Sequence, residues 1–319
     1  MKIYVTDCDH ADMNIEKKIF EEAGLSFEHC KAVTEDEVIR SCPDGEIFLV
    51  QYAHITEKVM ENIPSLKLIV RYGVGVDTVD LEAAARHGIQ VCNVPDYGMN
   101  EVADQAAAML LALKRKLTVM NRYTREEKWD YTKAIPIHRF SEQTVGIVGL
   151  GRIGRCFASR VHAFGFRILG YDPVYKEIPG MDYIQMTDFG TLLEESDAIS
   201  VHCPADGNRN LFAEEQFRRM KKEAVIINVS RGGIINERAL DQALSEGRIA
   251  GAGLDCLEKE PMEAGNPLLR HENLIVTPHM AWYSEEAAKE LKRKVAEEAV
   301  RFVKGEAVRY PLNQAGRKK

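Results

Sequence analysis

A glycine-rich turn near the middle of the chain constrains the fold most. Residues 144–148 (TVGIV) have the β-branched composition of a strand buried on both faces. Gly149, Gly151 and Gly154 follow in the pattern G-x-G-x-x-G, and apolar residues at helical spacing come next. Strand, glycine turn and helix in this order are typical of a dinucleotide-binding fold, because the helix N-terminus presents free N–H groups to an anion.

Each glycine has its own task in such a turn. Gly149 permits the tight bend, Gly151 leaves room for a pyrophosphate, and Gly154 lets the helix pack closely on the strand. A second strand ends at Asp172, which lies 18 residues after Gly154. An acid about 20 residues on binds the adenosine ribose and repels a 2′-phosphate, which favours NAD over NADP. The alternative, a plain turn with an unrelated surface Asp, does not explain this combination.

The length and composition of the chain exclude several classes of protein. With 319 residues, 45% hydrophobic and 29% charged, the chain is long enough for two domains. A net charge of −7 argues against nucleic acid or an anionic membrane as partner, and the basic tail 317–319 is too short to change this. We see no membrane span, signal peptide or zinc spacing. Seven scattered cysteines fit a reducing cytoplasm, so we expect a cytoplasmic protein without a metal.

Strand-like and helical stretches alternate along the chain, which predicts an α/β fold with two doubly wound parallel-sheet domains. We expect a flavodoxin-like substrate domain from residues 1–98, joined by 285–319, and a Rossmann-type dinucleotide domain over 99–284. A helix over 100–120 is expected to be buried between the two bodies. Predicted strands lie at 2–6, 47–51, 66–71, 90–94, 144–148, 166–171, 198–203, 225–229, 250–254 and 274–277.

Candidate catalytic residues follow the carboxyl ends of the predicted strands, where ligands bind in doubly wound sheets. Reduction of a keto acid requires a proton donor, a cation for the carboxylate and a presented nicotinamide. His279, Arg231 and Glu260 supply the matching side chains, with Glu260 expected to stabilise the imidazolium of His279. Singly, each residue fits a cap, a turn or a surface loop equally well.

A second glycine turn lies in the first domain. Residues 71–77 (RYGVGVD) directly follow a predicted strand. Two glycines flanking Val74 would leave backbone N–H groups open as a nest for a carboxylate. A plain tight turn explains this stretch alone at least as well.

Eight short motifs together resemble the D-isomer-specific 2-hydroxyacid dehydrogenase family over nearly the whole chain. The motifs are RYGVGVD at 71–77, GLGRIG at 149–154, YDP at 171–173, VHCP at 201–204, NVSRGG at 228–233, GAGLD at 251–255, EP at 260–261 and TPH at 277–279. The resemblance implies a homodimer formed through the dinucleotide domain.

The resemblance also implies roles for individual residues. His279 is the acid/base, Glu260 tunes it and Arg231 binds substrate, while Tyr72, Gly73, Val74 and Gly75 hold the substrate carboxylate through N–H groups. We also place His202 and Trp282 in the cofactor set. His202 fits the cap of a strand equally well, and Trp282, just past His279, fits a wall of the substrate pocket, packing or an interface equally well. The full predicted NAD-binding set is Gly149, Gly151, Arg152, Ile153, Gly154, Asp172, His202, Cys203, Pro204, Val229, Ser230, Asp255 and Trp282.

We therefore predict an NAD-dependent oxidoreductase that interconverts 2-keto and D-2-hydroxy acids. D-3-phosphoglycerate dehydrogenase activity is one alternative. An NAD(H)-sensing, corepressor-like binding protein is another, although such a module would not need all three catalytic side chains. A formate dehydrogenase is disfavoured, because that branch has Gln where Glu260 stands.

Overall fold

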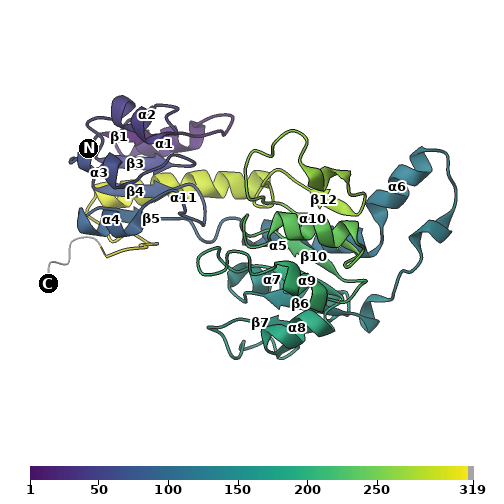
Figure 1. Ribbon diagram of the computed structural model, residues 1–319. Coiled ribbons are helices and arrows are strands. Elements are labelled where there is room, and N and C mark those ends of the chain that lie inside the picture. Colours follow the sequence, from purple (N-terminus) through teal and green to yellow (C-terminus); the bar gives the residue numbers. More distant parts are fainter. Residues whose placement is uncertain (315–319) are drawn as a thin grey trace. The chain divides into compact units, whose positions relative to one another are not determined.

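The computed structural model describes residues 1–314 and separates into two compact units. One unit comprises Met1–Gly98 with Ser284–Lys319, and the other comprises Met99–Tyr283. Each unit contains its own parallel sheet, with helices of that unit packed against it (Figure 1). The basic tail 317–319 lies outside the described residues.

The first unit has a five-stranded sheet in the order β2-β1-β3-β4-β5. Its inner strands β1, β3 and β4 are almost wholly apolar because helices cover both faces. Helices α2, α3 and α4 contribute to one core, while α1 and α11 pack on each other and α11 packs on β4. The elements are β1 (Ile3–Val5), α1 (Asn14–Glu22), β2 (Phe27–His29), α2 (Glu35–Ser41), β3 (Ile47–Val50), α3 (Glu57–Asn62), β4 (Leu68–Arg71), α4 (Leu81–Arg86), β5 (Gln90–Cys92) and α11 (Glu285–Val303).

The second unit has a seven-stranded sheet in the order β12-β11-β10-β9-β6-β7-β8. Strand β6, inside this sheet, pairs with β7 on one side and β9 on the other, so the winding direction reverses there. Helices α5 and α7 contribute to one core, and α8, α9 and α10 to another. The helices are α5 (Met99–Lys114), α6 (Leu117–Arg125), α7 (Arg152–Ala163), α8 (Phe189–Glu195), α9 (Glu214–Arg219), α10 (Glu237–Ser245) and the 3-10 helices η1 (Tyr131–Ala134), η2 (Phe140–Glu142) and η3 (Pro267–Arg270). The strands are β6 (Thr144–Val148), β7 (Arg167–Tyr171), β8 (Ile184–Met186), β9 (Ala198–Val201), β10 (Val225–Asn228), β11 (Gly251–Leu254) and β12 (Leu274–Val276).

The predicted fold class is confirmed: both sheets are wholly parallel, and their strand orders are those of a flavodoxin-like and a Rossmann-type domain. The two strands that the sequence pattern missed, β2 and β8, both lie at sheet edges. An edge strand buries less surface, so it carries a weaker apolar signal.

The predicted single helix over 100–120 is wrong. The structure has two helices, α5 and α6, separated at Lys116, whose left-handed backbone (φ +52°) ends the first helix. The apolar stretch within α5 is buried inside the second unit, against α7, β10 and β11, rather than between two bodies.

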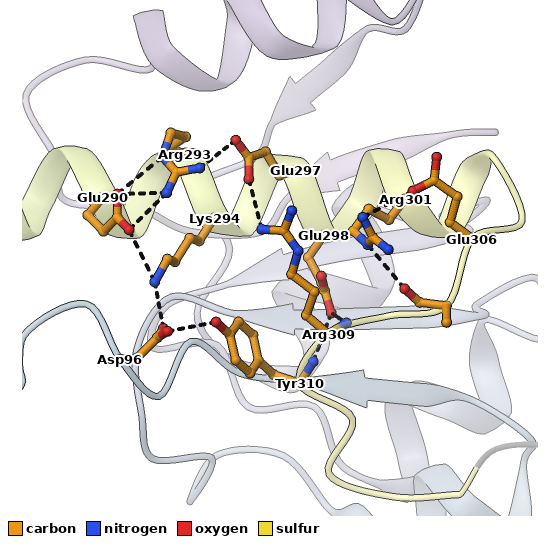
Figure 2. A network of polar contacts seen from close by, with 11 residues as sticks. Asp96, Glu290, Arg293, Lys294, Glu297, Glu298, Arg301, Glu306, Arg309 and Tyr310 are labelled. Atoms are coloured by element: carbon orange, nitrogen blue, oxygen red, sulfur yellow. Dashed lines mark hydrogen bonds and ion pairs between the residues drawn. The ribbon is translucent and has the colours of Figure 1, made fainter. Parts of the chain in front are cut away.

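A short C-terminal segment returns along the first unit after α11. We call residues 306–314 the C-terminal strap. Glu298 of α11 is 2% exposed, and its carboxylate accepts the N–H groups of Arg309 (2.5 Å) and Tyr310 (3.1 Å) (Figure 2). Farther along, Leu312 donates its N–H to the carbonyl of Val91 in β5 (2.9 Å). The strap thus joins α11 to the edge strand of the first sheet.

Candidate functional site

The glycine turn joins β6 to α7 and has the shape that an approaching phosphate requires. Gly149 has φ +93°, and a Cβ there would lie 2.7 Å from the backbone N of Cys203. A Cβ on Gly154 would lie 2.1 Å from the carbonyl oxygen of Gly149. A Cβ on Gly151 would meet nothing within 4 Å. Packing therefore requires two of the glycines, whereas Gly151 faces open space at the N-terminus of α7.

Asp172 follows β7 and bonds directly to the glycine turn. Its Oδ2 accepts the N–H of Leu150 (2.7 Å), and its Oδ1 accepts the N–H groups of Val174 (2.8 Å) and Tyr175 (3.2 Å). These bonds fix the carboxylate beside the turn, which is the location expected of a ribose-binding acid. Arg152 and Ile153 begin α7 on the other side of the turn.

The segment after β9 lies against the glycine turn and contains His202, Cys203 and Pro204. His202 donates its N–H to the carbonyl of Val148 (2.7 Å), and its Nε2 pairs with the hydroxyl of Ser200 (2.8 Å). Burial lowers the pKa of His202 to about 3, so the imidazole is neutral, and its Nδ1 is buried without a hydrogen-bond partner. Burial likewise raises the pKa of the Cys203 thiol to about 11. Neither side chain carries a charge near neutral pH.

Val229, Ser230 and Arg231 follow β10 in a turn shaped by Asn228. The Asn228 side chain accepts the N–H of Ser230 (3.0 Å) and donates to the carbonyl of Arg231 (2.8 Å). A Cβ on the next residue, Gly232, would lie 1.8 Å from the carbonyl oxygen of Leu257. The glycine therefore lets the Arg231 turn lie directly on the segment that leads to Glu260.

His279 and Glu260 form a hydrogen-bonded pair in the second unit. His279 Nδ1 lies 2.7 Å from Glu260 Oε2, and Glu260 Oε1 accepts the N–H of Leu257 (2.8 Å). Burial raises the pKa of Glu260, but the bond and charge of His279, with a contribution from Arg231, reverse this and hold it below its ordinary value. The ionised carboxylate can thus stabilise a protonated imidazole whose Nε2 is left for a substrate.

Asp255, at the end of β11, holds the turn that carries His279. Its buried carboxylate accepts the N–H groups of Met280 (3.0 Å) and Ala281 (2.9 Å) and the hydroxyl of Thr277 (2.5 Å). Its backbone carbonyl accepts the N–H of His279 (2.8 Å). This supporting role was not visible in the sequence, and a contact of Asp255 with NAD stays a prediction.

Trp282 lies shortly after the same turn. Its ring meets that of Tyr283 edge to face, with centroids 5.5 Å apart. This contact does not distinguish a cofactor contact from packing, so its place in the NAD-binding set also stays a prediction.

The second glycine turn belongs to the first unit and offers fewer free N–H groups than expected. Tyr72 donates its N–H to the carbonyl of Val50 (2.8 Å), and Gly73 donates to that of Arg71 (3.0 Å). Within residues 1–314, the N–H groups of Val74 and Gly75 have no acceptor. The predicted carboxylate nest therefore narrows to these two amides, while Tyr72 and Gly73 shape the loop.

Two residues around this loop were missed by sequence reasoning. Glu16 of α1 is fully buried and accepts the hydroxyl of Tyr72 (3.1 Å). Asn93, which follows β5, is 6% exposed and donates its side-chain amide to the carbonyl of Val74 (2.6 Å). Asn93 lies inside the predicted strand 90–94, and its bond to a backbone carbonyl leaves no signal in the sequence.

Known proteins are similar to this chain in both sequence and fold. Residues 107–281 match the family model for the NAD binding domain of D-isomer specific 2-hydroxyacid dehydrogenases. Glyoxylate reductase of Korarchaeum cryptofilum is 39% identical over 268 residues, which cover 82% of this chain and 80% of that protein. The chain belongs to the D-isomer specific 2-hydroxyacid dehydrogenase family. The family consists of NAD-dependent oxidoreductases acting on 2-hydroxy acids.

Other family members extend this comparison. D-3-phosphoglycerate dehydrogenase of Methanocaldococcus jannaschii is 38% identical over 302 residues, which cover 93% of this chain but only 56% of that enzyme. The structure of D-lactate dehydrogenase from Aquifex aeolicus, complexed with NAD and lactic acid, superposes with a TM-score of 0.85 at 28% identity, covering 95% of this chain and 96% of that one. The chain thus spans about half the length of the first of these relatives.

The described part of the chain contains neither a metal-binding cluster nor a membrane-spanning helix. Within residues 1–314, no group of three or more His, Cys, Asp and Glu side chains could hold a metal ion. None of the helices in that range is long and apolar enough to cross a membrane.

Proposed function

We propose that this family member catalyses NAD-dependent interconversion of a 2-keto acid and a D-2-hydroxy acid. The observation that supports this best is the His279–Glu260 pair, 2.7 Å apart in the unit that matches the NAD binding domain. The open side of Gly151 and the fixed carboxylate of Asp172 suit the pyrophosphate and ribose of NAD. Bound NADH would supply the hydride to C2 of the substrate.

The side chains divide the remaining chemistry between them. In reduction, Nε2 of protonated His279 donates a proton to the oxygen that develops charge, and in oxidation the neutral imidazole takes it back. Glu260 holds Nδ1 and stabilises the imidazolium. The guanidinium of Arg231 forks onto the substrate carboxylate and polarises the adjacent carbonyl.

The substrate carboxylate would bind the free N–H groups of Val74 and Gly75. Two adjacent amides form a small anion-binding nest. This gives the first unit a part in recognising the carboxylate, alongside Arg231, and leaves the redox chemistry to the second unit. The remaining predicted NAD-binding residues follow the strand ends of the second sheet and are proposed to line the cofactor site.

A substrate panel tests this function. The purified protein would be assayed for NADH oxidation with pyruvate, glyoxylate, hydroxypyruvate, 4-methylthio-2-oxobutyrate and phenylpyruvate, and for NAD reduction with 3-phosphoglycerate. Turnover of a 2-keto acid supports the proposal, and preference for phosphoglycerate would select that alternative. Tight NADH binding without turnover of any compound would contradict an enzyme and favour the sensing protein.

We also propose that the protein is a cytoplasmic homodimer. The seven cysteines are free thiols, as a reducing compartment requires. Helix α6 has no buried residue, and large apolar side chains around it are exposed. Leu117 is 57% exposed, Trp129 92% and Tyr131 78%, and a second copy of this chain would cover them.

Light scattering after gel filtration checks the dimer. We expect twice the chain mass of 35.9 kDa for the native protein and a single chain mass for the Trp129→Glu variant. Val174→Glu, at a residue that is 78% exposed elsewhere in the second unit, should remain dimeric. A native protein that elutes as a monomer would contradict this part of the proposal.

A further inference from the structure

The directions of the Val74 and Gly75 N–H groups are fixed by hydrogen bonds to the carbonyls in the same peptide units. In a trans peptide unit the C=O and N–H point in opposite directions, so fixing one fixes the other. The carbonyl of Gly73 accepts the N–H of Val94 (3.0 Å). The carbonyl of Val74 accepts the side-chain amide of Asn93 (2.6 Å). The N–H groups of Val74 and Gly75 therefore both point away from residues 93–94.

One of these two hydrogen bonds has a backbone donor and the other has a side-chain donor. Val94 acts through its backbone, which any residue except proline could do at that position. Asn93 acts through its side chain, which lies directly after β5 and is 6% exposed. The Gly75 amide thus depends on the identity of one side chain, whereas the Val74 amide does not.

The rest of the loop is fixed independently of Asn93. The side chain of Tyr72 is 2% exposed, and its hydroxyl donates to Glu16 in α1 (3.1 Å). Gly73 has φ +135°, and a Cβ there would lie 1.6 Å from the guanidinium of Arg71. Because these contacts anchor the start of the loop, loss of the Asn93 bond should free the Val74–Gly75 peptide without releasing the whole segment.

We propose that Asn93 is a positioning residue that aims the Gly75 N–H at the substrate carboxylate. This inference rests on the proposed function and adds a residue that touches neither substrate nor cofactor. Asparagine suits the task because its amide donates to a carbonyl and carries no charge. Aspartate is nearly the same size but has no donor when ionised, and it would repel the carbonyl of Val74. The peptide would then turn, and its N–H would leave the nest.

Steady-state kinetics of Asn93→Asp test the proposal. Using the 2-keto acid that native protein turns over best, we expect KM to rise about tenfold or more, because a charge-assisted bond to the carboxylate is lost. The kcat should fall less, and the dissociation constant of NADH should not change, because NADH binds the other unit. Asn62→Asp is the matched control: Asn62 also donates its side-chain amide to a carbonyl, that of Lys58 (2.8 Å), but at an exposed position of α3.

A binding experiment separates this inference from the proposed function. Oxamate, an unreactive 2-keto acid analogue, would be titrated into the protein–NADH complex while the amide resonances of Val74 and Gly75 are followed. The Gly75 resonance should shift in native protein and not in Asn93→Asp. If that variant does not fold, Asn93→Ser is measured by the same criteria.

The outcomes are distinct. Unchanged KM and an unchanged Gly75 shift in a folded variant would overturn the role of Asn93 and leave the proposed function standing. Native protein that neither binds oxamate nor turns over any 2-keto acid would overturn both, and that result would be seen without any variant.

Discussion

His279 has a backbone conformation that is uncommon for a residue with a side chain. Its φ of +52° lies in the left-handed region, which costs about 1 kcal/mol or more. The bonds from Asp255 to both sides of this residue hold it there. Strain that the surrounding structure maintains in this way is typical of functional sites. At this residue the conformation directs the imidazole to Glu260.

Asp172 should decide between NAD and NADP. In Asp172→Asn, loss of the negative charge removes repulsion of a 2′-phosphate, so we expect the preference for NADH over NADPH to fall about tenfold. The ratio of kcat/KM for the two cofactors measures this. Asp130→Asn is the control, because Asp130 also accepts a backbone N–H, that of Thr132 (2.9 Å), but before η1 and not at a strand end. An unchanged ratio in Asp172→Asn would contradict a ribose contact.

His202 should make stability depend on pH. The unfolded chain takes up a proton near pH 6.5, whereas folded His202 stays neutral until about pH 3, so the unfolded state binds more protons between these values. The contribution of His202 to the free energy of unfolding is therefore complete above pH 6.5. It falls by about 2 kcal/mol between pH 7 and pH 5. Thermal unfolding at pH 7 and pH 5 should show that His202→Asn loses less stability between these values than native protein does. The control His162→Gln, at an exposed residue of α7, should lose as much stability as native protein. Equal losses in all three would contradict the buried neutral imidazole.

Strand ends explain which site residues the sequence could predict. Asp172, Arg231 and His279 directly follow apolar strands, so their approach to one sheet edge could be expected from topology alone. Asn93 and the supporting role of Asp255 were missed, because each acts through a hydrogen bond to a backbone group that no sequence pattern records. The burial of the Tyr72 hydroxyl against Glu16 was missed for the same reason.

At the scale of elements, α11 and the C-terminal strap complete the first unit. Lys294 of α11 pairs with Asp96 (2.7 Å), and the hydroxyl of Tyr310 donates to the same carboxylate (2.7 Å) (Figure 2). Burial raises the pKa of Asp96, but its bonds to Lys294 and Tyr310 outweigh this and hold it below its ordinary value. Asp96 lies just before the chain leaves this unit at Gly98, so these bonds fix the start of that connection.

Two neighbouring glutamates of α11 should differ sharply in their effect on stability. Glu298→Ala removes a buried acceptor of two strap N–H groups, which we expect to cost about 2–3 kcal/mol of unfolding free energy. Glu297→Ala removes surface ion pairs with Arg293 and Arg309, which we expect to cost at most about 1 kcal/mol. Urea unfolding followed by a probe in the first unit measures both. Equal costs would contradict a strap anchored at Glu298.

Strands and helices with more buried residues were easier to predict from the sequence. The inner strands β6, β9 and β10 are mostly apolar and buried along their whole length, and each was expected within two residues of its observed bounds. The edge strands β2 and β8 were not expected, because each has only three residues with exposed positions. The break at Lys116 was missed because no glycine or proline marks it.

At the scale of the molecule, the two units have separate folds and different proposed roles. The first carries the proposed carboxylate nest and the second the NAD binding domain, and the chain passes between them at Gly98–Met99 and Tyr283–Ser284. A 2-keto acid that binds the nest must reach His279 for reaction, so we expect turnover to require both units. Binding of NADH should require only the second.

The measurement that tests the central claim most directly compares native protein with His279→Gln in turnover of the best 2-keto acid and in NADH binding. We predict that kcat falls about 10²–10⁴-fold, as expected when a general acid is removed. NADH binding should be unchanged. His271→Gln is the matched control, since His271 also pairs with a carboxylate, that of Asp241 (2.8 Å), elsewhere in the same unit. Turnover by His279→Gln at the native rate would contradict the assignment of His279 as the acid/base.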